Sequence, residues 1–507
     1  MTEQKTDPEC AGQEHSNAYD RIIKYTGLFG GVQGIVTLIT IVRTKLVSML
    51  LGPNGFGINE SFNRTLNLVK STTDLGIPFS AVKSVSECRE GRSEQLEESV
   101  LITRTWALLT AMAGMLLCIL LAPAFSYWAF DGDRGYTLSF LLLSPMAAFR
   151  AITGGETAIM KGSGMLGQLA KSQLLMVLAT LCISVPVLWT MGLPGIAPSL
   201  VLVSFASMVI TCCFSFRRFP YRVRLFSRET LTKGFGMIRL GVFFTITSFF
   251  GSGAFTIIAN YLMKNGSAEE TGIYSAGYLL ISYLGMFVFS AMESDYFPSI
   301  SAVNQDREKI NQLANSQTEV ALLLMAPIVV GFILFSGVIV SLLLTPKFAE
   351  AVPMARFAAV GLMFKCLTQP LSYISLAKGD SRTFMIQEVL YDVVFVAAVL
   401  GLFHVGGVIL TGAALTAAAM ADTVIVYSIT HARYGITISR RAIVVLALQL
   451  LLILSTLAAI SFIPGMLKWA AGLVLLVVST YYSLHHLKKH TSFIRTVEEK
   501  LKRKLRS

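Results

Sequence analysis

The chain has 507 residues, of which 54% are hydrophobic and only 14% are charged, whereas soluble domains carry about 25% charged residues. Together with a mean hydropathy of +0.64, this composition excludes a soluble globular protein and indicates an integral membrane protein. The net charge of +12 does not indicate nucleic-acid binding, because membrane proteins gather Lys and Arg in short cytoplasmic loops between apolar segments.

Apolar segments long enough to cross a bilayer follow one another along the chain. Such a segment needs about 20 residues, and the first twenty residues are too polar to form one or to act as a cleaved signal peptide. We expect about fourteen spans, at residues 26–50, 57–80, 101–127, 137–160, 166–191, 194–216, 235–262, 271–300, 316–344, 351–377, 382–403, 406–432, 442–463 and 466–485. The sequence therefore predicts an all-α polytopic membrane protein.

The loops between these segments are of two alternating kinds. One set is very short and poor in cations, as at residues 52–55 and 345–347, whereas the other is basic, as at residues 83–104 and 217–233. Because positively charged loops stay in the cytoplasm, we expect the basic loops and both termini to be cytoplasmic. An even number of spans agrees with this orientation.

Several short motifs recur in the two halves of the chain at nearly one offset. Gly57-Ile58 matches Gly272-Ile273, Arg150 matches Lys365, and Lys161-Gly162 matches Lys378-Gly379. The matches predict two six-helix lobes related by an internal repeat, followed by two further helices. The predicted organisation is an N-terminal cytoplasmic segment (1–25), an N-lobe (26–216), a basic cytoplasmic linker (217–234), a C-lobe (235–434), two C-terminal spans (435–485) and a basic amphipathic cytoplasmic tail (486–507).

Eight cations lie inside the apolar segments, namely Arg43, Lys45, Arg64, Lys70, Arg150, Arg239, Arg356 and Lys365. A charge at this depth costs at least about 2.5–3.5 kcal/mol, so such a set indicates a polar interior that binds an anion. We expect Arg43, Arg64, Lys70, Arg150 and Lys365 to line one cationic cavity for the substrate. Arg239 and Arg356 lie near the ends of their spans, where contact with water is a sufficient explanation.

Arg150 and Lys365 occupy equivalent spans of the two predicted lobes. A guanidinium binds phosphate with two parallel hydrogen bonds and an ammonium acts as a point charge, so the pair suits pyrophosphate. The alternative is that each cation is neutralised by an acid, such as Glu156 for Arg150. We disfavour this alternative for Lys365, because its own span has no acid deeper than Glu350.

The second predicted span carries a polar face. Glu60, Arg64, Asn67, Ser71 and Asp74 are spaced 4, 3, 4 and 3 residues apart, with Asn63 and Lys70 beside them. This spacing places them on one side of a helix. We expect Glu60, Asn63, Asn67, Ser71 and Asp74 to form the polar wall of the cavity, the alternative being interhelical hydrogen bonds and salt bridges that close the bundle.

Two acids lie deep in the eleventh and twelfth spans. Asp392 and Asp422 could bind H⁺ or Na⁺ and couple an ion gradient to transport. The chain shows no metal-binding motif, and its seven cysteines have neither a metal spacing nor a disulfide framework. We therefore expect an ion gradient and no cofactor.

Six short motifs are spread over both halves of the chain: LGPNGFG at 51–57, DLGI at 74–77, AVKSVSE at 81–87, GIY at 272–274, YFPSIS at 296–301 and AKG at 377–379. Through them the chain resembles Wzx-type flippases of the multidrug/oligosaccharidyl-lipid/polysaccharide exporter (MOP) superfamily, particularly the enterobacterial-common-antigen branch. It implies a two-lobed, V-shaped carrier in the bacterial inner membrane that moves an undecaprenyl-pyrophosphate-linked oligosaccharide by alternating access. The glycan, whether O-antigen, common antigen, capsule or peptidoglycan precursor, is left open. Implied partners are membrane lipids and the polysaccharide polymerase and chain-length machinery.

Two other functions fit a polytopic membrane protein. A multidrug antiporter of the same superfamily, driven by Na⁺ or H⁺, would favour acids and aromatic residues over buried cations. A glycan polymerase or ligase would need a larger external loop than any in this chain. An ATP-driven flippase is excluded because the phosphate-binding motif Gly-x-x-x-x-Gly-Lys-Ser/Thr does not occur.

Overall fold

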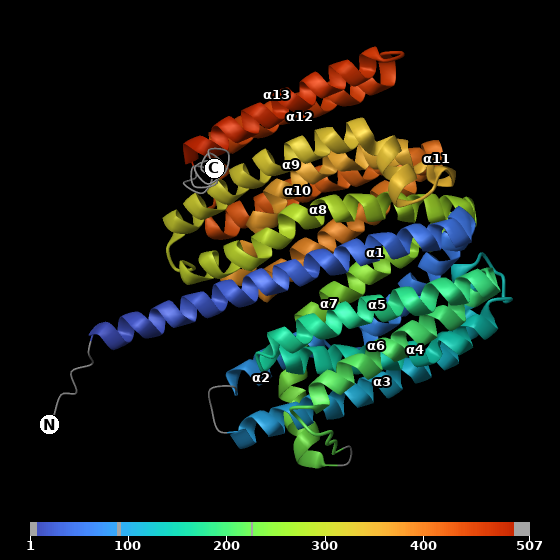
Figure 1. The fold of residues 1–507 in the computed structure, drawn as a ribbon, viewed down its shortest axis with the longest axis vertical. Helices are drawn as coiled ribbons and strands as arrows, with labels where there is room; N and C mark the ends of the chain where they lie inside the picture. The colour runs from blue at the N-terminus through green and yellow to red at the C-terminus, as the bar shows by residue number, and fades with distance from the viewer. Residues whose placement is uncertain (1–7, 89–92, 225–226, 491–507) are drawn as a thin grey trace, which may run out of the picture. The chain divides into compact units, whose positions relative to one another are not determined.

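A computed structural model describes residues 8–88, 93–224 and 227–490, except the side chains of residues 8–34, 236–242, 290–295 and 488–490 and of a few single positions. Of the predicted amphipathic tail at 486–507, residues 491–507 lie outside the described residues. The described part is helical, with 3₁₀ turns at Leu193–Gly195 and Pro346–Phe348 and no strand. Its helices are α1 (Pro8–Thr73), α2 (Ile77–Glu87), α3 (Ser93–Ala129), α4 (Thr137–Gly162), α5 (Leu166–Met191), α6 (Ile196–Phe216), α7 (Arg228–Asn265), α8 (Ala268–Ala302), α9 (Arg307–Leu343), α10 (Ala351–Ala377), α11 (Ser381–Tyr434), α12 (Arg440–Phe462) and α13 (Leu467–His490) (Figure 1).

Two of these helices each contain two predicted spans. The backbone of α1 breaks at Gly52, which has φ 63° and precedes Pro53, and α11 breaks at Gly406 and Gly407. Eleven helices in the described part are long and apolar enough to cross a membrane, and α8 covers the predicted eighth span. Each of the fourteen predicted segments thus corresponds to a helix or to one half of a broken helix, which confirms the polytopic all-α fold.

The second predicted span ends earlier than expected. Its helix stops at Thr73, and the chain turns at Leu75 and Gly76, which both have positive φ, before α2 begins. The prediction of one continuous helix through residue 80 was therefore wrong. A turn of the chain and the separate short helix α2 take the place of its last residues.

The contacts divide the chain into two compact units. Unit 1 contains residues 1–51 and 65–245, and unit 2 contains residues 52–64 and 246–507. One boundary falls within α7, between Thr245 and Ile246. A short part of α1 belongs to unit 2.

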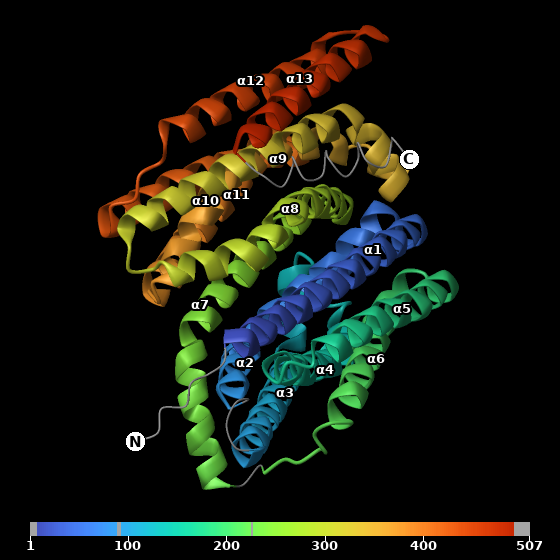
Figure 2. The same ribbon diagram turned by 60° about the vertical axis from the view of Figure 1, so that its left-hand side comes forward.

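Helix α4 is central in unit 1, where it packs against α2, α3 and α6. Figures 1 and 2 both show α3, α4, α5 and α6 side by side. Small residues allow this close approach: a Cβ at Gly155 would lie 2.7 Å from Ala107 of α3, and one at Gly162 would lie 2.7 Å from Val85 of α2.

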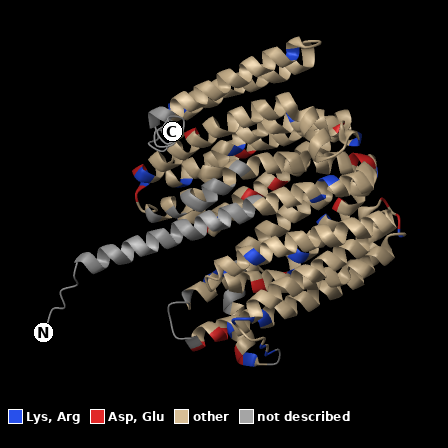
Figure 3. Cartoon of the chain, viewed as in Figure 1, with Lys and Arg blue, Asp and Glu red and all other residues tan. Residues whose placement is uncertain are grey.

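Helix α10 is central in unit 2, where it packs against α8, α9 and α11, and α12 and α13 pack against α9. Buried hydrogen bonds join α12 to α13: the Gln449 amide donates to Ser483 over 3.0 Å and accepts from Ser479 over 2.8 Å. Charged residues are sparse along most of the helices (Figure 3). The few charges within the spans are therefore the first place to look for function.

Candidate functional site

Unit 1 contains a pocket of about 450 Å³ between α1, α2, α4 and α6. Its lining residues are Asn67, Lys70, Pro78, Arg150, Thr153, Gly154, Thr157, Ala158, Lys161, Val203, Ser204 and Ser207. Three of them are cations, and none of these described lining residues is acidic. The pocket therefore has the charge of an anion-binding site.

The periodicity of α4 explains most of this lining. Arg150, Thr153, Thr157 and Lys161 are spaced 3, 4 and 4 residues apart, which places them on one helical face. Arg150 lies near the middle of α4 and Lys161 lies in its last turn. The pocket therefore follows the half of α4 that the loop charges predict to be cytoplasmic.

Arg150 is held by a neutral partner. Its Nη1 donates a hydrogen bond of 2.8 Å to Oδ1 of Asn67 on α1. The suggested pairing with Glu156 does not occur, because Glu156 binds Arg104 instead. The Asn67 amide orients the guanidinium through a charge-assisted hydrogen bond.

The predicted polar wall of span two is divided. Asn67 and Lys70 line the pocket, whereas Asp74 lies outside it and accepts a hydrogen bond from Gly76 N over 3.2 Å. Ser71 is buried and donates to the carbonyl of Leu68 in its own helix. The remaining members, Glu60 and Asn63, belong to unit 2, where Asn63 donates to the carbonyl of Asn59.

The five predicted substrate cations do not share one pocket within a unit. Lys70 and Arg150 share the pocket of unit 1, to which Lys161 adds a third cation that the sequence analysis left out. Arg43 does not line it, because its Nε donates to Ser184 of α5 over 3.1 Å. Arg64 and Lys365 belong to unit 2.

Arg64 is buried among aromatic rings in unit 2. Its guanidinium lies 5.2 Å from the ring centre of Phe255 and 5.9 Å from that of Tyr274. Nη2 donates to Ser275 over 3.4 Å, and Nε lies 3.8 Å from Glu60. These partners support the alternative of interhelical polar contacts for this cation.

The prediction that Lys365 has no acidic partner was wrong. Its Nζ lies 2.7 Å from Oδ2 of Asp422, and its ammonium sits 3.5 Å from the ring centre of Tyr391. The sequence analysis disfavoured an acidic partner because it considered only the lysine's own span, but the acid comes from α11. Asp422, an expected ion-coupling residue, is thus engaged by a cation of the protein.

Asp392, the other coupling candidate, has a different environment. Its residue is only 9% exposed, and no described residue donates a hydrogen bond to its carboxylate. Glu388 lies one helical turn before it, and both acids interact electrostatically with Lys365. The sequence analysis missed Glu388, although the spacing of four residues places both acids on one face of α11.

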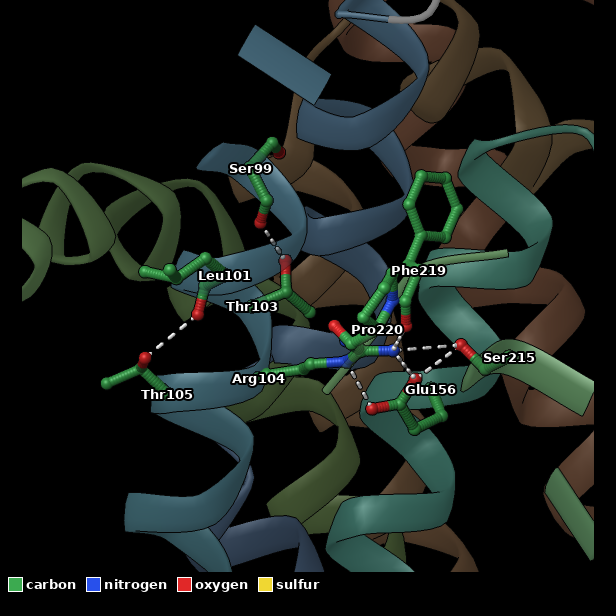
Figure 4. Close-up of polar contacts among 9 residues, drawn as sticks. All are labelled: Ser99, Leu101, Thr103, Arg104, Thr105, Glu156, Ser215, Phe219 and Pro220. Atoms are coloured by element: carbon green, nitrogen blue, oxygen red, sulfur yellow. Dashed lines mark hydrogen bonds and ion pairs between the residues drawn. The ribbon is translucent and has the colours of Figure 1, made fainter. Parts of the chain in front are cut away.

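The sequence analysis also missed Arg104, which it assigned to a basic loop. The structure buries Arg104 on α3, where Nε and Nη2 donate to the two Glu156 oxygens over 2.7 and 3.1 Å (Figure 4). Ser215 donates to the same carboxylate over 2.5 Å. An acid inside a predicted span requires a partner, so Glu156 was the signal that could have identified this pair.

The remaining donors of Arg104 bind the chain just after α6. Nη1 donates to the carbonyl of Pro220 over 2.8 Å, and Nη2 donates to that of Phe219 over 3.1 Å. Nearby, at the start of α7 and outside its membrane span, Lys233 binds Glu229 and Glu98, and these hydrogen bonds raise the pKa of Lys233 above its usual range. This polar network is structural, because its buried cation is fully paired.

Known structures share this architecture. An inward-closed structure of the lipid II flippase MurJ aligns with a TM-score of 0.69 and 14% identity, over 91% of this chain and 99% of that one. An inward-facing multidrug resistance MATE family transporter of the MOP superfamily gives 0.66 and 16%, over 79% and 94%. A MOP superfamily transporter from Pyrococcus furiosus gives 0.56 and 15%, over 80% and 93%. The fold is that of MOP superfamily membrane transporters.

The family is defined by a sequence match. A family model described as polysaccharide biosynthesis protein matches residues 46–353, and the chain belongs to that family. No curated protein sequence matches the chain significantly. The polysaccharide biosynthesis family and the shared fold both agree with the resemblance to Wzx-type flippases.

Proposed function

We propose that the protein is a flippase that moves an undecaprenyl-pyrophosphate-linked oligosaccharide from the cytoplasmic to the periplasmic leaflet of the bacterial inner membrane by alternating access. The observation that carries this proposal is the pocket of unit 1, in which Lys70, Arg150 and Lys161 meet without an acid among the described lining residues. The polysaccharide biosynthesis family agrees with a glycan as cargo.

The chemistry of the pocket suits a pyrophosphate. Its walls have a lower dielectric constant than water, so three cations attract an anion more strongly there than at an open surface. Arg150 supplies a planar guanidinium, and Lys70 and Lys161 supply point charges. Hydroxyl groups of Thr157 and Ser204 add donors for phosphate oxygens.

Transport against a gradient needs an energy source, and unit 2 offers candidate groups for it. We assign ion coupling, by H⁺ or Na⁺, to Asp392 and Asp422, with Glu388 as an additional member. The support is that Asp392 is buried without a hydrogen-bond donor among the described residues, whereas Asp422 is bound to Lys365. A change in the charge of Asp392 would therefore alter its electrostatic interaction with the ion pair of Lys365 and Asp422.

A multidrug antiporter is the second candidate, favoured by the carboxylates of unit 2. Such a protein would export an organic cation, which Glu388 and Asp392 could attract. The cationic pocket of unit 1 disfavours this candidate.

The proposal is tested by export of glycan to the cell surface. The double variant Arg150→Ala/Lys161→Ala is expected to accumulate in the membrane but to export at least tenfold less polysaccharide, since hydrogen bonds to charged groups contribute roughly 1.5–3 kcal/mol each. Lys171→Ala, which removes an exposed cation of unit 1 outside the pocket, is the matched control. Parental export by the double variant would refute the proposal.

The proposed orientation, with both termini cytoplasmic, has its own test. A cysteine at His404, at the break in α11, is expected to react with an impermeant thiol reagent in intact cells, whereas one at Arg441 is not. Both positions are exposed, so accessibility depends on the side of the membrane. Labelling of Arg441→Cys from outside would contradict the proposed orientation.

A further inference from the structure

The segment after α6 presents arginines stacked on aromatic rings. The guanidinium of Arg217 lies 5.5 Å from the ring centre of Phe214, and that of Arg218 lies 5.8 Å from that of Phe219. Both arginines are exposed, and neither forms an ion pair with any described residue. Their charge is therefore available to an external anion.

This segment is fixed to unit 1 rather than left as a free loop. Arg104 binds the carbonyls of Phe219 and Pro220, as Figure 4 shows, and the backbone N of Arg224 donates to Thr105 over 3.3 Å. Phe219 is buried in an apolar cluster with Val100 of α3. The two exposed arginines thus have a defined place on the protein surface.

The neighbouring arginines have a different role. Arg222 lies 3.6 Å from Glu97, and Arg222 and Arg224 line a cavity of about 340 Å³ with Glu97, Glu98 and Glu229. Those carboxylates would repel an anion. Arg217 and Arg218 do not line this cavity, so of these four arginines they are the two that combine exposure with the absence of a nearby acid in the described contacts.

The position of the segment matches the depth of lipid head groups. The apolar helix α6 ends at Phe216, directly before the two arginines. Tyr221 is 51% exposed and packs on Phe216 with ring centres 5.1 Å apart, and such amphipathic aromatic residues gather where membrane meets water. Basic residues at the end of a span attract anionic head groups at about 1 kcal/mol each.

We propose that Arg217, Arg218 and Tyr221 form a docking surface for the phosphate head group of an anionic phospholipid. Guanidinium groups bind phosphate oxygens through paired hydrogen bonds, and the stacked rings hold the two guanidinium groups in place. Arg104 is the positioning residue of this surface, since it fixes the segment without contacting the lipid. The inference is independent of which cargo the protein carries.

The test uses the full-length protein in nanodiscs made of equal parts phosphatidylcholine and phosphatidylglycerol. Lipids that stay bound after release into detergent are counted by native mass spectrometry. For the double variant Arg217→Gln/Arg218→Gln we expect retention of phosphatidylglycerol to fall on the order of tenfold, with retention of phosphatidylcholine unchanged. The control variant Arg222→Gln/Arg224→Gln removes two exposed arginines of the same segment that line the cavity with Glu97, Glu98 and Glu229, and it should retain the parental amount.

Three results would overturn the inference. The Arg217→Gln/Arg218→Gln variant could keep its phosphatidylglycerol, or the control variant could lose as much, which would reduce the effect to net charge. Alternatively, added farnesyl pyrophosphate could bind in an Arg217- and Arg218-dependent manner while phosphatidylglycerol does not, which would assign the surface to isoprenyl pyrophosphates. Because both arginines are exposed, the variants are expected to fold, as an unchanged thermal transition would verify.

Discussion

The two units hold cations at corresponding points of the predicted repeat, but with different partners. In unit 1, Arg150 binds the neutral amide of Asn67, and in unit 2, Lys365 binds the carboxylate of Asp422. An amide carries no charge, whereas a carboxylate cancels the charge of the cation that it binds. The difference teaches that a buried cation is evidence for an anion site only after its partner is known.

This comparison predicts that mutations of the two kinds of cation differ in their main effect, on stability for one kind and on function for the other. A carboxylate-paired cation should be needed for the folded protein, and an amide-paired cation should be needed for the substrate. Four substitutions test this, from the largest expected loss of stability to the smallest.

Arg104→Ala should be the most damaging. It leaves the carboxylate of Glu156 buried without its cation, and removal of one partner of a buried pair costs about 3–5 kcal/mol. We expect little membrane-inserted protein and a strongly lowered thermal transition in detergent. Arg104→Ala at parental yield and thermal stability would show that carboxylate pairing is not structural here.

Lys365→Ala should be the next most damaging. Its side chain is 25% exposed, whereas that of Asp422 is only 4% exposed, so the expected loss is roughly 2–3 kcal/mol, below the range for a fully buried pair. The double variant Lys365→Ala/Asp422→Ala should regain part of the lost stability, because it leaves no unpaired charge. Thermal unfolding of the single and double variants measures the coupling, and additive effects would contradict the structural role of the pair.

Arg150→Ala should affect binding rather than stability. The side chain is half-buried and binds the neutral amide of Asn67, so we expect the free energy of unfolding to change by less than about 0.5 kcal/mol. Affinity for pyrophosphate, measured by calorimetry, should fall roughly tenfold. Arg150→Lys should recover part of the affinity if charge alone matters, and little if the guanidinium shape matters. If the Arg150→Ala protein were unfolded, Arg150 would be needed for stability, as Lys365 is expected to be, and the proposed difference between the two units would be refuted.

Asp392→Asn should change stability least. It replaces a buried carboxylate that lacks a donor among the described residues, so the thermal transition should stay the same or rise. Glycolipid export should lose its dependence on an imposed H⁺ or Na⁺ gradient. Gradient-driven export at the parental rate would remove Asp392 from the coupling mechanism.

The sequence predicts the helices well and their cross-contacts poorly. Hydropathy identifies every span, because each segment must present apolar side chains to the bilayer and must satisfy its backbone hydrogen bonds within its own helix. The pairs of Arg104 with Glu156 and of Lys365 with Asp422 join different helices, so no periodicity within one helix reveals them. The wall predicted for span two was divided for the same reason: one helical face does not specify which neighbour covers each turn.

The buried amide of Gln449 has a consequence for the synthesis of the chain. The ribosome delivers α12 before α13, and until α13 arrives the amide lacks Ser479 and Ser483 as partners. Such a group in hydrocarbon is costly, so α12 should leave the translocon for lipid only together with α13. We therefore expect α12 and α13 to enter the bilayer as one hairpin.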